Sequence, residues 1–260
     1  FATALVSSLS AARTVKLAGA TTSVLEHLAG LDASRSDRQR REFTANISHD
    51  LRTPLTSLLG YLETLSLKAD SLTPEETKHY LTIALRQGQK VRHLSQQLFE
   101  LARLEHGSIR PQRERFAPGE LISDVAQKFD LIVQTRQLRL KIEVPQQLPM
   151  VNADLSMIER VVTNLLDNAV RHTPPGGEIW LKVWQEGEAL QMEVSDSGPG
   201  IDAAMREELF QRPSALKPEA REHRGGLGLL IVRRMLELHG GGIRLMEAEQ
   251  GARFRFYVPL

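Results

Sequence analysis

The sequence predicts an all-α antiparallel helical hairpin followed by an α/β sandwich, and three observations indicate this order. Between about residues 47 and 105, apolar residues recur three and four apart, which is the period of amphipathic helices. After Gly107 the pattern changes to short alternating strands between helices. The 260 residues are long enough to build both units. We expect three regions, an upstream linker over 1–38, the hairpin over 39–107 and the sandwich over 108–260.

The first long helix is expected over Gln39–Leu67. Its apolar stripe consists of Ile47, Leu51, Leu55, Leu58, Leu62 and Leu65. His49 lies opposite this stripe and should face solvent, with Asp50 directly after it. Pro54 lacks the N–H that would bond the carbonyl of Asp50, so the helix should bend just beyond the histidine. This arrangement indicates a reactive histidine, although a solvated surface histidine is the alternative for any single residue.

The second helix is expected over Pro74–Glu105. Thr73 is a suitable N-cap and Glu76 follows it by three residues, which is the spacing of a capping box. The apolar face of this helix carries Tyr80, Ala84, Val91, Leu94, Leu98, Leu101 and Leu104. Two amphipathic helices bury little by themselves, whereas two hairpins paired in a four-helix bundle bury both stripes. The sequence therefore predicts a homodimer.

The elements of the second unit follow from alternation and from breaks at glycine and proline. Strands are expected at Pro111–Phe116, Leu140–Val144, Met150–Asn152, Glu178–Gln185 and Ala189–Ser195, with a final hairpin through Gly242–Ala248 and Arg253–Val258. Helices are expected at Pro118–Arg136, Leu155–Arg171 and Leu229–His239. Helices on one face of a mixed sheet form an α/β sandwich.

Asn164 and Asn168 are four residues apart and therefore share one face of their helix. Amide oxygens are suitable ligands for Mg²⁺, which binds mainly through substrate phosphates. Arg171 and His172 follow at the helix end, where they can reach a phosphate. The alternative for this segment is an ordinary polar helix face.

The strand that ends at Ser195 runs into the turn Asp196–Gly200. A carboxylate at a strand end can accept a hydrogen bond from an exocyclic amine, and glycines let the backbone approach a flat ring. An ordinary turn built on Asp and Gly would have the same sequence.

Gly225, Gly226 and Gly228 immediately precede the last expected helix. Backbone N–H groups at a glycine-rich helix start bind phosphate. The spacing is not that of the dinucleotide fingerprint. The charged stretch 203–224 before it has little apolar periodicity and is expected to form a lid. Its candidate phosphate contacts are Lys217, Arg221 and Arg224.

The segment SHDLRTPL (Ser48–Leu55) resembles the phosphoacceptor box of sensor histidine kinases. The later segments, in this order, resemble the N, G1, F, G2 and G3 boxes of the ATP-binding domain of that family. Together the resemblance covers Gln39–Leu260. It implies that the second unit has the Bergerat fold shared with Hsp90, gyrase B and MutL.

The resemblance also implies roles for individual residues. His49 would be autophosphorylated, Asp50 would orient or deprotonate its imidazole, and Thr53 would act in dephosphorylation of the partner. Asn168, supported by Asn164, would bind Mg²⁺, and Asp196 would read the adenine amino group. The other expected nucleotide contacts are Arg171, His172, Gly198, Gly200, Arg224, Gly226, Leu227 and Gly228. His239 lies at the same boxes and could contact nucleotide.

Three positions depart from the family pattern. Pro213 stands where a second aromatic residue is common after Phe210, and Arg224 stands where the first glycine of the G2 box usually falls. Ala252 replaces the usual threonine of the G3 box. These changes concern nucleotide affinity and lid closure, because they leave His49 and the asparagine pair in place.

The sequence therefore predicts the cytoplasmic catalytic core of a sensor histidine kinase, with ATP and Mg²⁺ as cofactors and a response regulator receiver domain as partner. A net charge of +1 and an aromatic content of 5% argue against nucleic acid as a partner, and the lack of cysteine fits a reducing compartment. We expect membrane anchoring of the full-length protein, with residues 1–12 following either a transmembrane helix or a plain linker. The alternatives are a nucleotide-binding scaffold without phosphotransfer and an ATPase of the Hsp90 or MutL group.

Overall fold

The computed structural model describes residues 37–69, 71–105, 109–202, 206, 209–210 and 226–260. The chain divides into two compact units, and the main division falls between residues 106 and 107. The expectations for the upstream linker and for most of the lid lie outside the described residues. Among the site residues expected from the sequence, this applies to Arg224. It also applies to four other residues named above, Pro213, Lys217, Arg221 and Gly225.

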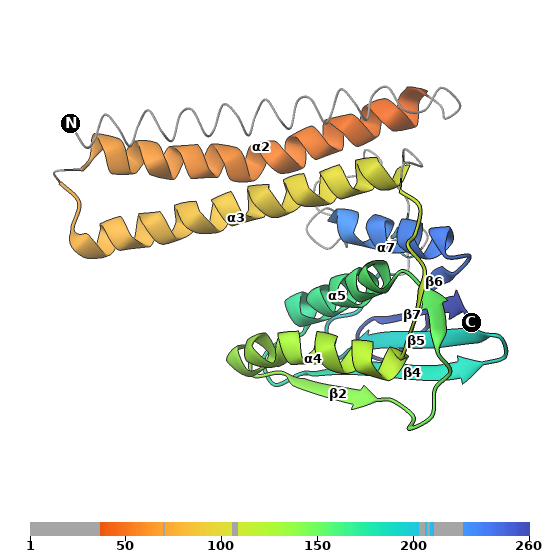
Figure 1. Ribbon diagram of the computed structural model, residues 1–260. Helices are drawn as coiled ribbons and strands as arrows, with labels where there is room; N and C mark the ends of the chain where they lie inside the picture. Colours follow the sequence, from red (N-terminus) through yellow and green to blue (C-terminus); the bar gives the residue numbers. More distant parts are fainter. Residues whose placement is uncertain (1–36, 70, 106–108, 203–205, 207–208, 211–225) are drawn as a thin grey trace. The chain divides into compact units, whose positions relative to one another are not determined.

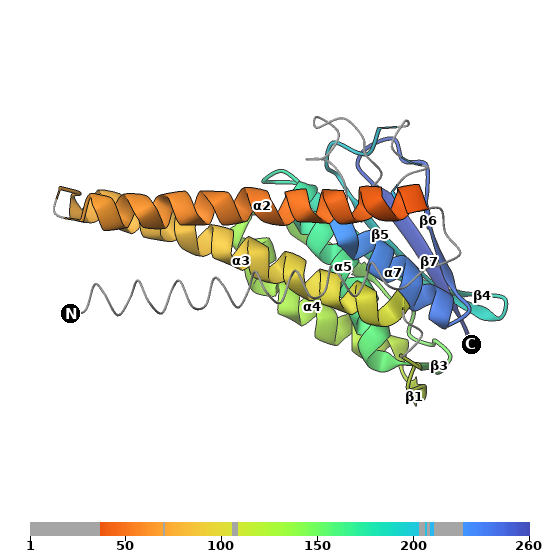
Figure 2. The same cartoon turned by 90° about the horizontal axis from the view of Figure 1, so that it is seen from above.

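The first unit is a hairpin of two long helices, α2 (Asp37–Leu67) and α3 (Pro74–Glu105), which lie side by side (Figure 2). Both ends of α3 and the C-terminal end of α2 are where the sequence predicts them. The helix α2 continues through Pro54. The hairpin core consists of Ile47, Leu51, Ala84, Val91, Leu98, Leu101, Ala102 and Leu104.

The apolar stripe of α2 is only partly covered within one chain. Leu55, Leu58, Leu62 and Leu65 remain half-exposed, and Leu81 and Leu85 of α3 are exposed. At about 25 cal/mol for each Å² of apolar surface removed from water, covering such a stripe is a substantial driving force for association.

The capping box at the start of α3 is formed as predicted. The Thr73 N–H donates to Glu76 Oε2 (2.9 Å), and the Glu76 N–H donates to Thr73 Oγ1 (3.2 Å). These bonds hold the pKa of the Glu76 carboxyl below its ordinary value. Two backbone donors at the helix start are thereby satisfied, which explains why the helix begins at this point.

The second unit is built on a mixed sheet with the strand order β2-β4-β5-β7-β6. Its strands are β2 (Arg139–Glu143), β4 (Glu178–Glu186), β5 (Ala189–Asp196), β6 (Gly242–Leu245) and β7 (Arg253–Pro259). The strand β2 runs parallel to β4, and all other pairs are antiparallel. A separate two-stranded sheet pairs β1 (Glu114–Phe116) with β3 (Val151–Ala153).

Three helices, α4 (Pro118–Thr135), α5 (Leu155–His172) and α7 (Gly226–Leu238), cover one face of the sheet (Figure 1). The strand residues that face them are buried and apolar, among them Leu181, Met192 and Phe256. The alternate residues lie on the opposite face, where Arg255 lies over the Trp184 ring (5.1 Å). Most of them are partly exposed there, but Glu193 and Ser195 are buried. The sheet is therefore buried on one face, and the prediction of an α/β sandwich is confirmed.

The start of α7 corrects the sequence-based prediction. The helix begins at Gly226 rather than Leu229, so Gly226 and Gly228 lie in its first turn rather than before it. The apolar side chains of Leu227, Leu229 and Leu230 are all buried, which explains why this turn is helical despite its glycines. Within the described residues, no helix is long and apolar enough to cross a membrane.

Candidate functional site

His49 is exposed on α2, as its position opposite the apolar stripe predicts. Its side chain is 56% accessible, and that of Asp50 is 54% accessible. The distance from His49 Nδ1 to Asp50 Oδ1 is 3.6 Å, which is longer than a hydrogen bond but within the range of an ion pair. The carboxylate therefore faces Nδ1, which leaves Nε2 as the nitrogen available for reaction.

Thr53 lies one helical turn beyond His49, on the same face. Its Oγ1 donates to the backbone carbonyl of His49 (3.2 Å). Both side chains are exposed. This places a hydroxyl group beside the exposed histidine without burying it.

The helix α5 presents the two asparagines. Asn164 is buried, and no described residue pairs with its Nδ2 atom. Asn168, one turn further on, is half-buried, whereas the apolar residues Val161, Leu165 and Val170 pack into the core. An unpaired buried amide is costly, so Asn164 is a residue that a polar ligand would satisfy.

Asp196, at the end of β5, is a buried carboxylate with one oxygen that accepts hydrogen bonds from the backbone. Its Oδ1 accepts from the Gly198 N–H (2.8 Å) and the Ala252 N–H (3.4 Å). No described residue donates to Oδ2. Burial raises the pKa of the Asp196 carboxyl above its ordinary value, although the two N–H groups and nearby His172 oppose this shift. An amino group that donates to Oδ2 would therefore stabilise the charged form.

The backbone around Asp196 is packed too closely for side chains. A Cβ atom at Gly198 would lie 2.8 Å from the carbonyl oxygen of His172, and one at Gly251 would overlap the carbonyl of Asp196. Gly200 and Gly251 both have positive φ (78° and 72°), and they approach each other. Gly251 begins the segment that resembles the G3 box, but it is not among the site residues expected from the sequence.

The helices α5 and α7 pack along each other and meet at Asp154 and His239, so α7 runs back along α5. Each helical residue advances about 1.5 Å, so Gly226 lies about 20 Å from His239. The turn between Asn164 and Asn168 lies at about the same distance from Asp154 along α5. The fold therefore brings the glycine-containing start of α7 level with the asparagine pair.

The structure places the other expected contacts around this region. His172 is half-buried and its carbonyl backs Gly198, whereas Arg171 is exposed at the end of α5. Leu227 and Gly228 are buried in the first turn of α7. Phe210 packs edge-on against Phe254 of β7 (6.2 Å between ring centroids).

The prediction that His239 could contact nucleotide is wrong. Its ring is buried, and both ring nitrogens are engaged by backbone groups. Asp154 is the N-cap of α5 and lies against this histidine. This pair could not be predicted from the sequence, because its two members are 85 residues apart along the chain.

Two family models match the chain. Residues 39–107 match the model described as the His Kinase A (phospho-acceptor) domain. Residues 153–260 match the model described as the histidine kinase-, DNA gyrase B- and HSP90-like ATPase. The chain belongs to the histidine kinases.

Relatives of this histidine kinase carry the same two regions. Sensor histidine kinase TmoS of Ectopseudomonas mendocina is 35% identical over 91% of this chain and 24% of its own length. The structure of histidine kinase ThkA in complex with response regulator protein TrrA is 25% identical, with a TM-score of 0.70, over 86% of this chain and 64% of that chain. The structure of full-length ShkA in complex with AMPPNP is 26% identical, with a TM-score of 0.61, over 83% of this chain and 45% of that chain. The chain spans 24–31% of the length of the first curated relatives that it matches.

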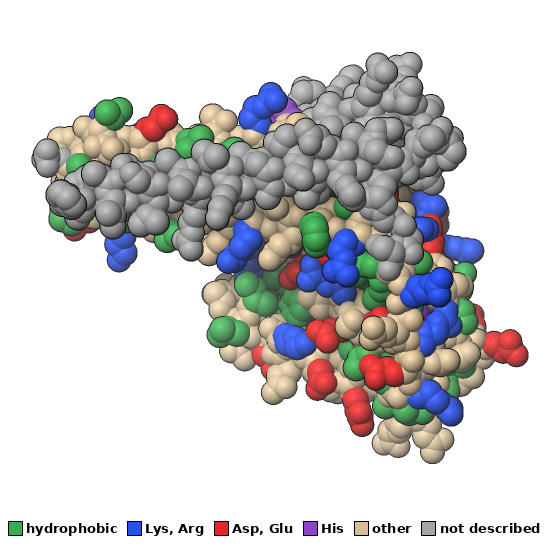
Figure 3. Space-filling model, turned by 45° about the horizontal axis from the view of Figure 1, so that its top comes forward, with side chains coloured by type: hydrophobic (Ala, Val, Ile, Leu, Met, Phe, Trp, Pro, Cys, Tyr) green, Lys and Arg blue, Asp and Glu red, His purple; other side chains and the backbone are tan. Residues whose placement is uncertain are grey.

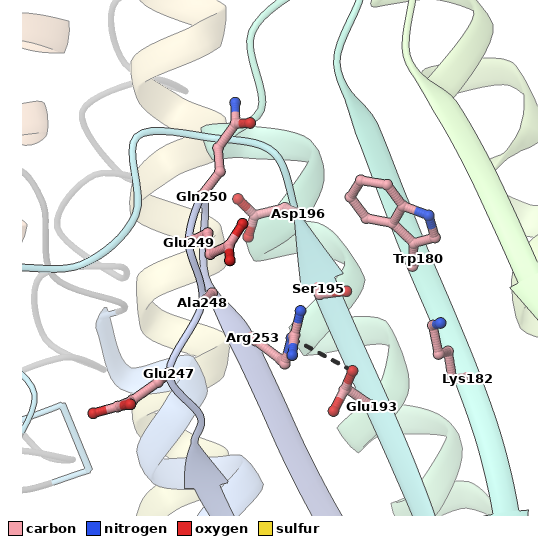
Figure 4. Close-up of a pocket in the computed structure, with 10 residues that line it drawn as sticks. All are labelled: Trp180, Lys182, Glu193, Ser195, Asp196, Glu247, Ala248, Glu249, Gln250 and Arg253. Carbon is pink, nitrogen blue, oxygen red and sulfur yellow. Dashed lines mark ion pairs between the residues drawn. The ribbon is translucent and has the colours of Figure 1, made fainter.

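The histidine kinase chain also has a hollow of about 690 Å³ on the solvent face of its sheet. Trp180, Lys182 and Ser195 line it from the strands, and Arg253 pairs there with Glu193 at 3.6 Å (Figure 4). Asp196 borders it, but the helices that carry the asparagines and glycines cover the opposite face. Acidic and basic side chains are interspersed over the surface seen in Figure 3.

Proposed function

We propose that this histidine kinase core uses ATP to phosphorylate His49 and then transfers the phosphoryl group to an aspartate of a response regulator receiver domain. The observation that carries the proposal is an exposed histidine with an adjacent carboxylate on α2, joined in one chain to an α/β unit with the Asp196 site. The complex of ThkA with TrrA supports a regulator as partner. The membrane anchor and sensor region of the whole protein rest on the resemblance to sensor histidine kinases alone.

The nucleotide site would be formed by Asp196 and the two asparagines. Asp196 Oδ2 is suited to accept a hydrogen bond from the adenine amino group, because Oδ1 is the oxygen held by the Gly198 and Ala252 N–H groups. Asn164 and Asn168 would hold Mg²⁺ through their amide oxygens, and Mg²⁺ would neutralise phosphate charge. The AMPPNP complex of ShkA supports ATP as the nucleotide. Mg²⁺ is supported by the asparagine pair, whose amide oxygens are suitable ligands, whereas the unpaired Asn164 Nδ2 is a donor that would bond an acceptor such as a phosphate oxygen.

The reaction is a displacement at the γ-phosphorus. His49 Nε2 attacks, the P–N bond forms, and the bond to the bridging oxygen of ADP breaks. The proton on Nδ1 faces Asp50, which stabilises the cationic ring that attack creates. Catalysis then rests on positioning and on charge neutralisation of the transferred group.

A nucleotide-binding scaffold without phosphotransfer is the main alternative. The two are separated by incubating the chain with γ-labelled ATP, removing free nucleotide, and adding a purified receiver domain. Transfer of label from the chain to the receiver domain is expected. A chain that binds ATP and acquires no label would instead be a scaffold.

The chain should be a homodimer through α2 and α3. The half-exposed stripe Leu55, Leu58, Leu62 and Leu65 is the reason, because pairing with a second hairpin would remove it from water. Sedimentation equilibrium should give twice the mass of the chain at micromolar concentration. As a control, Leu58→Glu should dissociate the dimer, and a wild-type monomer would contradict this interface.

Thr53→Ala should lose phosphatase activity toward the phosphorylated receiver domain and keep autophosphorylation. Its hydroxyl lies beside His49, where it can orient a water molecule that attacks phosphoaspartate. We expect at least a tenfold loss of receiver dephosphorylation, measured with phosphorylated receiver domain and ADP. Thr64→Ala, which removes the same type of hydroxyl-to-carbonyl bond further along α2, is the matched control. An equal loss of both activities would show a structural role for Thr53.

A further inference from the structure

His239 joins the end of α7 to the start of α5 through both ring nitrogens. The backbone N–H of Asp154 donates to His239 Nε2 (3.0 Å), and His239 Nδ1 lies 2.7 Å from the carbonyl oxygen of Met235. The side chain is 2% exposed. The two helices that carry the nucleotide site are therefore connected by one buried imidazole.

These contacts fix the protonation state of the ring. A backbone N–H can only donate, so Nε2 must carry no proton. A carbonyl can only accept, so Nδ1 must carry one. This is the neutral tautomer with hydrogen on Nδ1. Protonation of Nε2 would set two N–H groups against each other and break the bond to α5.

The Asp154 carboxylate already accepts hydrogen bonds through both oxygens, so it cannot replace the lost bond by accepting from a protonated His239. Its Oδ1 accepts from the Met157 N–H (3.1 Å) and from Ser156 Oγ (2.7 Å), and its Oδ2 accepts from the Gln112 N–H (2.8 Å). Turning toward a protonated ring would cost the N-cap of α5 or the bond to the strand entry at Gln112.

The connection lies about 20 Å from the site, but it sets how the two helices align. Gly226 and Gly228 lie level with Asn164 and Asn168 in this alignment, and the hydrogen bond to Asp154 holds α7 at its far end. A shift of about 1 Å between helices is enough to weaken a preorganised site.

We propose that His239 is a positioning residue, whose neutral ring holds α5 and α7 in the alignment that binds nucleotide and whose protonation weakens that binding. The inference rests on the proposed ATP function. It identifies a proton as a regulator of the same site, acting from the other end of the two helices.

The direction of the pH effect follows from the surroundings of the ring. Burial lowers the pKa of His239 below its ordinary value; the hydrogen bond to Met235 and the charge of Asp154 oppose this, and Arg113 adds to it. The neutral ring is therefore favoured at neutral pH. The unfolded chain binds a proton near pH 6.5 and the folded chain at lower pH, so stability falls as the pH drops below about 6.5.

The test compares the full wild-type chain with His239→Gln and His239→Leu, using Mg²⁺ and AMPPNP in calorimetric titrations from pH 7.5 to 5.5. Glutamine can accept from Asp154 and donate to Met235 without titrating, so its affinity at pH 7.5 should lie within about threefold of wild type. Leucine can do neither, so the His239→Leu variant should bind AMPPNP at least tenfold more weakly than wild type. Below the folded pKa of His239, wild type should lose up to about tenfold in affinity per pH unit beyond the loss of the glutamine variant.

The titration of the AMPPNP phosphates and of His172 contributes equally to wild type and His239→Gln. It therefore cancels when the pH dependence of their affinities is compared. Parallel pH curves for these two chains, over a range in which ¹⁵N spectra show His239 becoming protonated in wild type, would overturn the inference. If the variants do not fold, ¹⁵N spectra of the wild-type histidines decide, since a protonated Nε2 on His239 at pH 7.5 would contradict it. A wild-type chain that binds no AMPPNP at pH 7.5 would overturn the proposed function itself, and this inference with it.

Discussion

His49→Gln should eliminate incorporation of label from γ-labelled ATP while nucleotide binding survives. The loss should be at least a thousandfold, to the detection limit, because glutamine has no nucleophilic ring nitrogen. His49 is exposed on α2 and belongs to a different compact unit from Asp196, so the substitution leaves the nucleotide site unchanged. Labelling is measured after denaturing electrophoresis, and nucleotide binding is measured by calorimetry with AMPPNP.

The labelled product should also have the stability of a phosphoramidate, which is labile to acid and stable to base. His79→Gln is the matched control, because His79 is an exposed histidine on α3 without a following acid and proline. That variant should keep full labelling. Acid-labile phosphate that persists in His49→Gln would show that another histidine is the acceptor.

Asn168→Ala should abolish Mg²⁺-dependent ATP binding and leave the dimer intact. The substitution removes an amide ligand beside buried Asn164, and alanine is the stronger helix former, so α5 should persist. We expect at least a hundredfold weaker binding in the presence of Mg²⁺. Calorimetric titrations with Mg²⁺ and with a chelator separate the metal-dependent part of the affinity.

The control for this experiment is Gln134→Ala, which removes an exposed amide from α4 of the same unit. Its nucleotide affinity should equal that of wild type. Sedimentation of Asn168→Ala should still give the dimer mass. Normal Mg²⁺-dependent affinity in this variant would mean that another group holds the metal.

The features that could be predicted from the sequence are local ones. The exposure of His49 follows from the angular period of one helix, and the start of α3 follows from the spacing of Thr73 and Glu76. The alternation in β4 and β5 determines which residues enter the core, because a strand turns successive side chains to opposite faces. Each of these needs information only from residues within about one or two dozen positions along the chain.

The tertiary structure decided which segments meet. The sequence places glycines near Asp196, but only the fold shows that Gly251 passes against its carbonyl and that the Ala252 N–H reaches Oδ1. The helical turn from Gly226 to Gly228 contradicts local propensity, because buried leucines outweigh the cost of glycine in a helix.

His239 is the clearest example of a contact that could not be predicted from the sequence. Its partner Asp154 lies 85 residues away along the chain, and no sequence motif includes both residues. A pattern of polarity specifies that a residue is buried, but not which donor it will meet there. That pairing depends on the packing of α5 against α7, and it is therefore decided only when the whole domain is assembled.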